Sequence, residues 1–251
     1  MAKPKPKYGY NPEPRLSANQ LAELVNATPT RRKSIIAAAK FPSSAVVAKY
    51  KDASSSLVDF LANPARSVPT FTSAIAMLEG KASDPSLKQW ARDDAARSAE
   101  ALSAVIQHYN KTGLGKLSLK KLPNKQPKIL LEGVEISASA ACSVHGKFKG
   151  ESAVGCLSLL FNKSEPSARV RDERCKTAAV LSILFSEQHL SHLGVAVPKL
   201  NMSYDVFLGK LVVAPNTFKK RLSDMSLACE EVVLRWPTIE PPEGYDGPEV
   251  S

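Results

Sequence analysis

Residues 153–161 read AVGCLSLLF, and this stretch decides the fold class of the 251-residue chain. Nine consecutive residues without a charge are typical of a β-strand that is covered on both faces. Upstream, residues 134–142 read VEISASAAC and alternate between apolar and polar side chains, which predicts a strand with one buried face. Gly146 and Gly150 lie between the two stretches, so we expect an antiparallel hairpin whose loop is longer than the tightest type.

Two helices and one more strand are expected after the hairpin. Residues 172–193 predict a helix whose middle is apolar on nearly all sides, so it should lie across the sheet. Residues 203–213 predict a strand that bends or bulges at Gly209. Residues 218–236 predict a last helix with one apolar stripe, which Pro237 ends.

Helices dominate the chain before the hairpin. Ser17 is a suitable N-cap, and Pro29 stands at the first turn of a second helix. Apolar residues recurring at steps of three and four predict further helices, of which the last is the longest. The expected helices are residues 17–26, 28–40, 56–62, 70–79 and 85–109.

Together these patterns predict an α+β (α/β) fold, in which an N-terminal helical region precedes a small mixed or antiparallel sheet packed with two or more helices. Composition shifts suggest boundaries between the parts, because prolines, glycines and charge runs separate the periodic segments. The expected parts are a disordered basic arm (1–15), a helical region (16–110), a basic linker (111–128), an α/β domain (129–236) and a disordered acidic tail (237–251).

The second half of the chain has the order strand, strand, helix, strand, helix, and an earlier helix precedes it and can cover the sheet. This order resembles the core of the PD-(D/E)xK nuclease superfamily over residues 125–236. The resemblance spans about one small domain. In that superfamily an acid on the second core strand and an acid-x-Lys triplet on the third bind a divalent metal ion, which activates water and stabilises charge on the phosphate. The resemblance therefore implies a nuclease-like core.

The catalytic motif of that superfamily is missing. Residues 134–142 contain only one acid, Glu135, and residues 153–161 contain no charged residue. Glu151 and Lys163 flank the second stretch but are too far apart to form the triplet. We therefore expect an inactive core that serves binding. A nuclease with a displaced active site is the alternative, and its candidate catalytic residues are Glu135, Glu151, His145 and Asp205.

Positive charge is concentrated in particular segments of the chain, whose net charge is +10. Residues 1–51 carry ten Lys or Arg against Glu13 and Glu23, and residues 111–128 carry six lysines and no acid. Such polarity favours a polyanionic partner, most commonly the phosphates of DNA or RNA. A solvated, flexible basic surface explains the same charge without a partner. The expected nucleic-acid-binding residues are Arg31, Arg32, Lys33, Lys40, Lys116, Lys120, Lys121 and Lys125.

Three of these cations, Arg31, Arg32 and Lys33, fall in the first turn of the second helix. Cations there oppose the helix macrodipole, and this small cost would make sense if an anion bound at that end. A solvated basic face on an ordinary helical hairpin is the other interpretation.

Two pairs of Cys and His residues could either bind zinc or pack as ordinary core residues. Cys142-x-x-His145 and His189-x-x-His192 each offer two ligand types that suit zinc. Buried thiols and histidines at a helix end account for the same residues, so we favour no metal ligand among them and expect no zinc. No cofactor is predicted, and Mg²⁺ or Mn²⁺ would be needed only by the nuclease alternative.

The cellular location is expected to be the cytoplasm. The four cysteines are irregularly spaced within apolar segments, as reduced and buried thiols are. No apolar run approaches the roughly 18 residues of a membrane span, and residues 1–10 show no secretory pattern.

Our first functional hypothesis is a nucleic-acid-associated protein of a bacterial or mobile-element system, which contacts the phosphate backbone. The second is a protein-interaction subunit of an intracellular assembly of a defence or mobile-element system. The third is the metal-dependent nuclease. The sequence leans toward binding rather than catalysis because no nucleophile or metal motif is complete.

Overall fold

The computed structural model describes residues 6–43, 49–138, 140–161, 163 and 167–250. The fold is α+β, as the sequence predicts: five helices lead the chain, and mixed sheets packed with two later helices follow. The chain divides into two compact units that are both discontinuous in sequence. Unit 1 comprises residues 1–47, 126–138 and 217–251, and unit 2 comprises residues 48–125 and 139–216.

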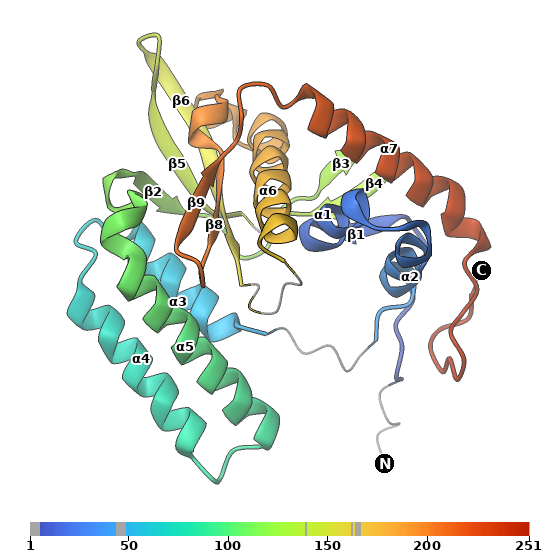
Figure 1. Cartoon of the computed structure of the whole chain (residues 1–251), viewed down its shortest axis with the longest axis horizontal. Coiled ribbons are helices and arrows are strands. Elements are labelled where there is room, and N and C mark those ends of the chain that lie inside the picture. Colours follow the sequence, from blue (N-terminus) through green and yellow to red (C-terminus); the bar gives the residue numbers. More distant parts are fainter. Residues whose placement is uncertain (1–5, 44–48, 139, 162, 164–166, 251) are drawn as a thin grey trace. The chain divides into compact units, whose positions relative to one another are not determined.

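Unit 1 is a three-stranded sheet with three helices (Figure 1). Its strands run in the order β1-β4-β3, with β1 parallel and β3 antiparallel to β4. Helix α1 packs against α2 and α7, and α7 also contacts β4. The elements are β1 (Arg15–Ser17), α1 (Ala18–Asn26), α2 (Pro29–Lys40), β3 (Ile129–Leu131), β4 (Val134–Ser137), α7 (Lys219–Arg235) and the 3-10 turn η4 (Trp236–Thr238).

Local signals set the beginnings of the first two helices. The Ser17 hydroxyl accepts the Gln20 backbone N–H, and the Gln20 side chain accepts the Ser17 N–H, which together form a capping box. Pro29 begins α2, where its missing N–H costs nothing. The expected N-cap and Pro start are therefore confirmed.

The described part of the basic arm and the acidic tail make contacts that the sequence analysis did not expect of two disordered segments. The Asp246 carboxylate accepts the backbone N–H groups of Lys7 (2.7 Å) and Tyr8 (3.1 Å), and these bonds lower the pKa of Asp246. The Tyr245 ring also packs edge-on against Phe41. The two ends of the chain thus meet within unit 1. Residues 1–5 and 251 of these two segments lie outside the described residues.

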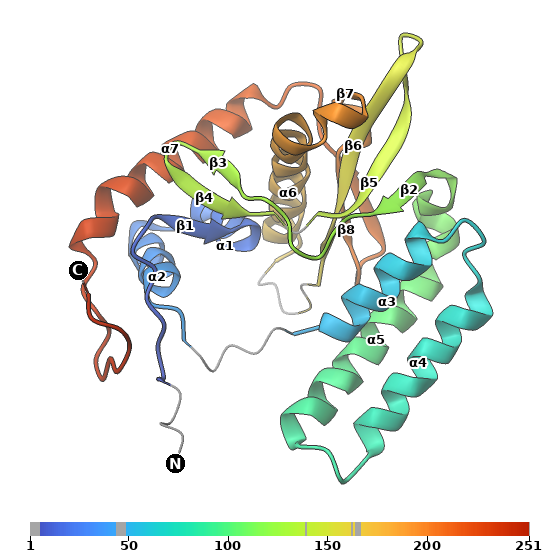
Figure 2. The same cartoon turned by 180° about the vertical axis from the view of Figure 1, so that it is seen from behind.

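Unit 2 combines a six-stranded mixed sheet with four long helices, which Figure 2 shows from behind. The helices and 3-10 turns are α3 (Lys51–Ala62), α4 (Val68–Ser83), α5 (Gln89–Thr112), η1 (Leu114–Lys116), α6 (Ala168–His189), η2 (Ser191–Leu193) and η3 (Pro198–Leu200). The strands are β2 (Ser118–Lys121), β5 (Ala140–Phe148), β6 (Glu151–Leu160), β7 (Val195–Ala196), β8 (Met202–Asp205) and β9 (Lys210–Val213).

The sheet of unit 2 runs in the order β2-β5-β6-β8-β9, and β7 pairs with β6 beside that path. Strand β5 pairs antiparallel with both β2 and β6, whereas β8 is parallel to β6 because α6 crosses over between them. Alternate side chains of β6 enter different cores: Leu157 and Leu159 pack with α3 and α5, and Leu160 packs with α6. Strand β6 is thus covered on both faces, as its sequence predicts.

The register of the hairpin differs from the prediction. Residues 134–137 leave this sheet to form β4 of unit 1, and the partner of β6 is β5, which begins only at Ala140. The connection is also the tightest type rather than a longer loop, because Phe148 pairs with Glu151 across two residues, Lys149 and Gly150. Both of those residues have positive φ, as a type I′ turn requires.

The segment expected as a linker, residues 111–128, is largely built into unit 2. Its residues 118–121 form the edge strand β2. The Arg66 guanidinium donates hydrogen bonds to the carbonyls of Leu114 (3.1 Å), Gly115 and Leu117, which satisfies the end of η1. The lysine-rich segment therefore includes an ordered sheet edge, and the chain passes from unit 2 to unit 1 near the end of the segment, between Lys125 and Gln126.

Strand β6 has different neighbours before and after Cys156. It pairs with β7 at Ala153–Val154 and with β8 from Leu157 onward. Between these ladders the Asn201 side chain accepts the backbone N–H of Cys156 (3.0 Å). Gly155 is required beside this junction, because an added Cβ would lie 2.1 Å from the Leu200 carbonyl oxygen.

The expected strand 203–213 is two strands, β8 and β9, with Gly209 in the connection at φ 60°. The four cysteines are free and buried, which confirms their expected packing role. Within the described ranges, no helix combines the length and the apolar character needed to cross a membrane.

Candidate nucleic-acid interface

The predicted cations of unit 1 lie at the start of α2 and are engaged by carboxylates of the same unit. Arg31 pairs with Glu23 on α1 (2.6 Å), and Arg32 pairs with Glu231 on α7 (2.7 Å). Lys33 is exposed and forms no ion pair with any described residue. The anions beside this helix end are therefore largely the protein's own.

Lys40 is not available to a partner, so its prediction as a nucleic-acid contact is wrong. Its residue is 4% exposed, and its ammonium donates to the carbonyl oxygens of Trp236 (2.7 Å) and Ile239 (3.0 Å). Burial lowers the pKa of Lys40. The turn that follows α7 covers the last residue of α2, and only the tertiary structure brings these segments together.

The four predicted lysines of unit 2, Lys116, Lys120, Lys121 and Lys125, are all exposed. Lys121 pairs with Asp59 on α3 (2.5 Å), where both side chains are open to solvent. The other three form no ion pair within the part of the chain that the structure describes. Their charges are therefore unneutralised at and beyond the β2 edge of the sheet.

The pairing of β2 with β5 places one of these lysines in a row with residues of β5. Lys120 lies opposite Ser143 and therefore shares a face of the sheet with His145 and Lys147, which follow at two-residue intervals. Helix α6 covers part of the same face, since Cys156, the β6 partner of Ser143, contacts Ser182. We call Lys120, His145 and Lys147 the basic row.

The pKa of His145 responds to its burial and to the positive charge of the basic row. Its Nε2 lies 2.9 Å from the Ser143 hydroxyl. Burial lowers the pKa of His145, and the positive charge of Lys120 lowers it further. A neutral histidine between two lysines is the form expected near pH 7, and an anion at this place would favour its protonation.

The basic row continues into the tip of the β5–β6 hairpin, which the sequence analysis did not single out. Lys149 occupies the turn, and the Phe148 ring beside it is 39% exposed. The ammonium groups of Lys149 and Lys199 lie 5.5 Å and 5.3 Å from the centre of that ring. The signal in the sequence was the Lys-Phe-Lys-Gly run at 147–150, where cations alternate with an aromatic between two strands.

The candidate catalytic residues of unit 2 are not brought together. Glu135 is on β4 in unit 1, whereas the others belong to unit 2. Within unit 2, Glu151 begins β6 at the hairpin turn and Asp205 pairs with Leu160 at the other end of that strand. His145 is nearer the middle, opposite Val154. Within unit 2, the carboxylates of Glu151 and Asp205 therefore stand at opposite ends of β6 and do not face one substrate.

Asp205 has a structural role. It is fully buried at the end of β8 and forms a two-pronged ion pair with Arg171 of α6, in which one bond measures 2.7 Å. The same carboxylate accepts the backbone N–H groups of Phe207 (3.1 Å) and Leu208 (2.9 Å). Both carboxylate oxygens of Asp205 therefore accept hydrogen bonds, and together they tie the start of α6 to the β8–β9 connection.

The candidate zinc ligands also lie apart. Cys142 and His145 are three residues apart on a strand, so they point to opposite faces, and burial raises the pKa of Cys142 to about 12. His189 packs edge-on against Phe185 at the end of α6, and His192 lies in η2. Among the described residues no three His, Cys, Asp or Glu side chains gather as a metal site would need.

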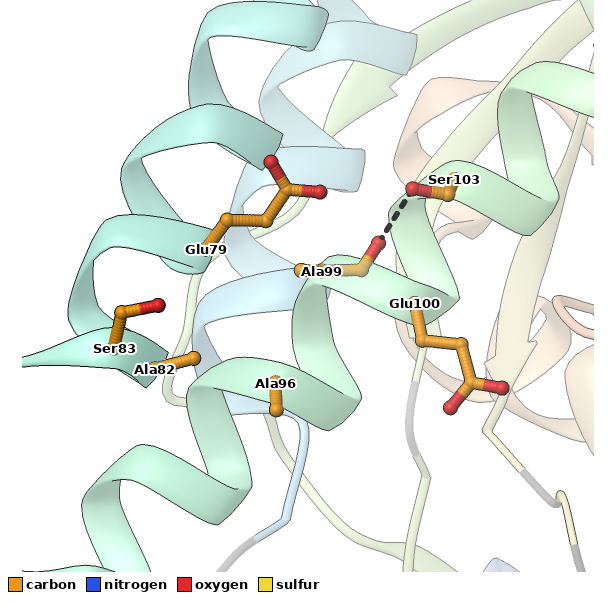
Figure 3. A pocket seen from close by; sticks show the side chains of 7 residues that line it. All are labelled: Glu79, Ala82, Ser83, Ala96, Ala99, Glu100 and Ser103. Carbon is orange, nitrogen blue, oxygen red and sulfur yellow. Dashed lines mark hydrogen bonds between the residues drawn. The ribbon is translucent and has the colours of Figure 1, made fainter.

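Two surface pockets of unit 2 contain acids but no complete site. A pocket of about 450 Å³ lies between α4 and α5, where Glu79 and Glu100 do not point toward one another (Figure 3). Glu100 is held by Lys163 at 2.6 Å. A pocket of about 620 Å³ next to the hairpin is lined by Glu151 and Glu187 together with small residues. Neither pocket offers a nucleophile paired with a base.

No protein-family model matches the chain, and no curated protein matches it in sequence.

Proposed function

We propose that the protein binds nucleic acid by contacting the phosphate backbone with lysines of unit 2. The observation that carries this proposal is the basic row, in which Lys120 and Lys147 flank His145 on one face of the sheet. Lys116 and Lys125 add exposed positive charge next to β2. Ammonium groups without an internal carboxylate partner can pair with phosphates and release counterions, which is the main source of such affinity.

The order of elements supports a nuclease-like core that binds without cleaving. Within unit 2, the helix α5, the strands β5 and β6, the crossover helix α6 and the strand β8 keep most of the order that suggested the PD-(D/E)xK resemblance, whereas its last helix, α7, belongs to unit 1. The acids that such a catalytic site requires are missing, since Glu151 is the only charged residue of β6 and stands at its exposed start. Binding is therefore the activity that the side chains favour over metal-dependent hydrolysis.

The direct test is charge reversal within the basic row, Lys120→Glu with Lys147→Glu. The matched control, Lys51→Glu with Lys88→Glu, changes the net charge equally at exposed positions next to the starts of α3 and α5, where acids suit the helix dipole. We expect the row variant to lose at least about tenfold in affinity and to reduce the salt slope by roughly two, while the control changes little. Equal losses in both variants, or none in either, would contradict the proposal.

A second measurement tests the absence of catalysis. DNA and RNA are incubated with the protein in Mg²⁺ or Mn²⁺ and analysed for strand breaks. We expect retention without cleavage. If the wild type cleaves nucleic acid and either Glu151→Ala or Glu135→Ala abolishes the cleavage, the result would instead support a nuclease with a displaced active site.

A further inference from the structure

We propose that the tip of the β5–β6 hairpin enters the major groove of double-stranded B-form DNA. This inference rests on the proposed function and names its ligand. The hairpin tip is defined as residues 147–151, and Lys199 of η3 is its neighbour through Phe148.

The tip extends beyond the rest of the sheet. The ladder of β2 ends opposite His145 and that of β7 ends opposite Ala153, whereas β5 and β6 continue to pair up to Phe148 and Glu151. In both whole-chain views it projects past the other elements of unit 2 (Figures 1 and 2). Three extended residues span about 10 Å, which is comparable with the depth of a major groove, about 8.5 Å.

The residue at the turn favours a functional reason for its charge. Lys149 and Gly150 have φ values of 51° and 89°, so they are the two central residues of a type I′ turn. Asn, Asp or Gly suit the first of these positions far better than Lys. Glycine has no Cβ, and the short side chains of Asn and Asp tolerate the left-handed region. Lys149 therefore carries its charge at the end of the projecting hairpin, where a phosphate can reach it, although its backbone conformation is not the one a lysine prefers.

The side chains of the tip are arranged around an aromatic ring. Phe148 holds the ammonium groups of Lys149 and Lys199 within 5.5 Å of its centre, while Lys147 extends from the opposite face of the ribbon. A hairpin with cations on both faces is suited to a DNA groove, because a phosphate backbone runs along each side of the groove. Glu151 is the single acid of the tip.

The dimensions of the tip favour duplex DNA over duplex RNA. A B-form major groove is about 12 Å wide and admits a two-stranded β-ribbon, whereas the minor groove is only about 6 Å wide. The major groove of an A-form RNA helix is too narrow for protein side chains to read. The tip should therefore bind duplex DNA more tightly than duplex RNA. The basic row should not distinguish between them, because it contacts only phosphates.

The test uses the full-length protein and the tip variant Lys149→Asn with Lys199→Gln, which keeps the hairpin and the basic row. The control, Lys51→Gln with Lys88→Gln, removes equal charge elsewhere in unit 2. Affinities for a 20-base-pair DNA duplex and an RNA duplex of the same sequence are measured by fluorescence anisotropy. Bound methyl green and netropsin report occupancy of the major and minor grooves.

We expect the tip variant to lose about tenfold in DNA affinity and under twofold in RNA affinity, and to melt no lower than the wild type because Asn suits the turn. The wild type should displace methyl green rather than netropsin. Equal loss for DNA and RNA, no loss, or displacement of netropsin alone would overturn the inference while binding through the basic row still stands. Failure of the wild type to bind any nucleic acid would overturn both proposals.

Discussion

The cations of α2 in unit 1 and the lysines around β2 and β5 in unit 2 are similar in sequence but differ in their surroundings. Arg32 and Lys40 of α2 are tied to Glu231 and to backbone carbonyls of the same unit. Lys120 and Lys147 are exposed and form no ion pair with described residues. A run of positive charge thus contributes to stability in one region and remains available for a partner in the other.

This difference predicts opposite consequences of mutation. Removing an internal cation should lower the free energy of unfolding and leave nucleic-acid affinity unchanged, whereas removing an exposed lysine of the basic row should do the reverse.

The largest effect is expected at the buried pair of Arg171 and Asp205. Arg171→Met leaves a fully buried carboxylate without its countercharge and should cost about 3–5 kcal/mol of unfolding free energy. Urea denaturation measures this cost. Adding Asp205→Asn keeps an acceptor for the N–H groups of the following loop and should recover much of the loss. If the double variant is as unstable as Arg171→Met, the ion pair is not the cause.

A smaller loss is expected at Lys40. Lys40→Met preserves the length of the side chain but leaves the carbonyls of Trp236 and Ile239 without their donor, at a cost of about 2 kcal/mol. Urea denaturation and DNA binding are measured on the same preparation. An unchanged stability with weaker DNA binding would return Lys40 to the interface and break the comparison.

The Arg32–Glu231 pair should contribute less, because both side chains are partly exposed. A double-mutant cycle of Arg32→Gln and Glu231→Gln is expected to give a coupling of at most about 1 kcal/mol, which decreases as salt is added. A coupling near zero would mean that Arg32 is held chiefly by the Ala27 and Val25 carbonyls, to which it also donates.

The smallest effect concerns pH. Since the folded protein lowers the pKa of His145, the unfolded chain takes up a proton first as the pH falls. This group therefore contributes stability above the unfolded pKa of about 6.5, and that contribution is lost as the pH falls through the lower folded value. Melting temperatures at pH 7.5 and 5.5 should differ less for His145→Gln than for the wild type. Saturating DNA should also reduce the difference if phosphate lies beside His145.

Local patterns predicted the elements better than their partners. The uncharged run of β6, the capping box at Ser17 and the final helix are set by side-chain periodicity or by groups within a turn. The alternation at residues 134–142 correctly indicated extended chain at residues 134–137 and 140–142, yet it could not reveal that β4 and β5 join different sheets. Strand pairing depends on distant residues, and alternation alone is the same for either partner.

The candidate interface was predictable only in part. Lys120 stood out because a run of lysines is visible in any sequence, but its row with Lys147 depends on the register between β2 and β5. Lys40 belonged to the same visible pattern and turned out to be buried. Composition counts charges, whereas burial and pairing determine which of them a partner can reach.

Periodicity and composition over a few neighbouring residues are enough to predict the α+β class, the apolar central strand, the main helices and the excess of positive charge. Three features became visible only in the folded chain. The chain forms two units that are discontinuous in sequence, and residues 118–121 form a sheet edge. Cations of α2 also pair with groups of their own unit, as Arg32 does with Glu231. Those outcomes depend on contacts between residues far apart in the chain, which no local pattern encodes.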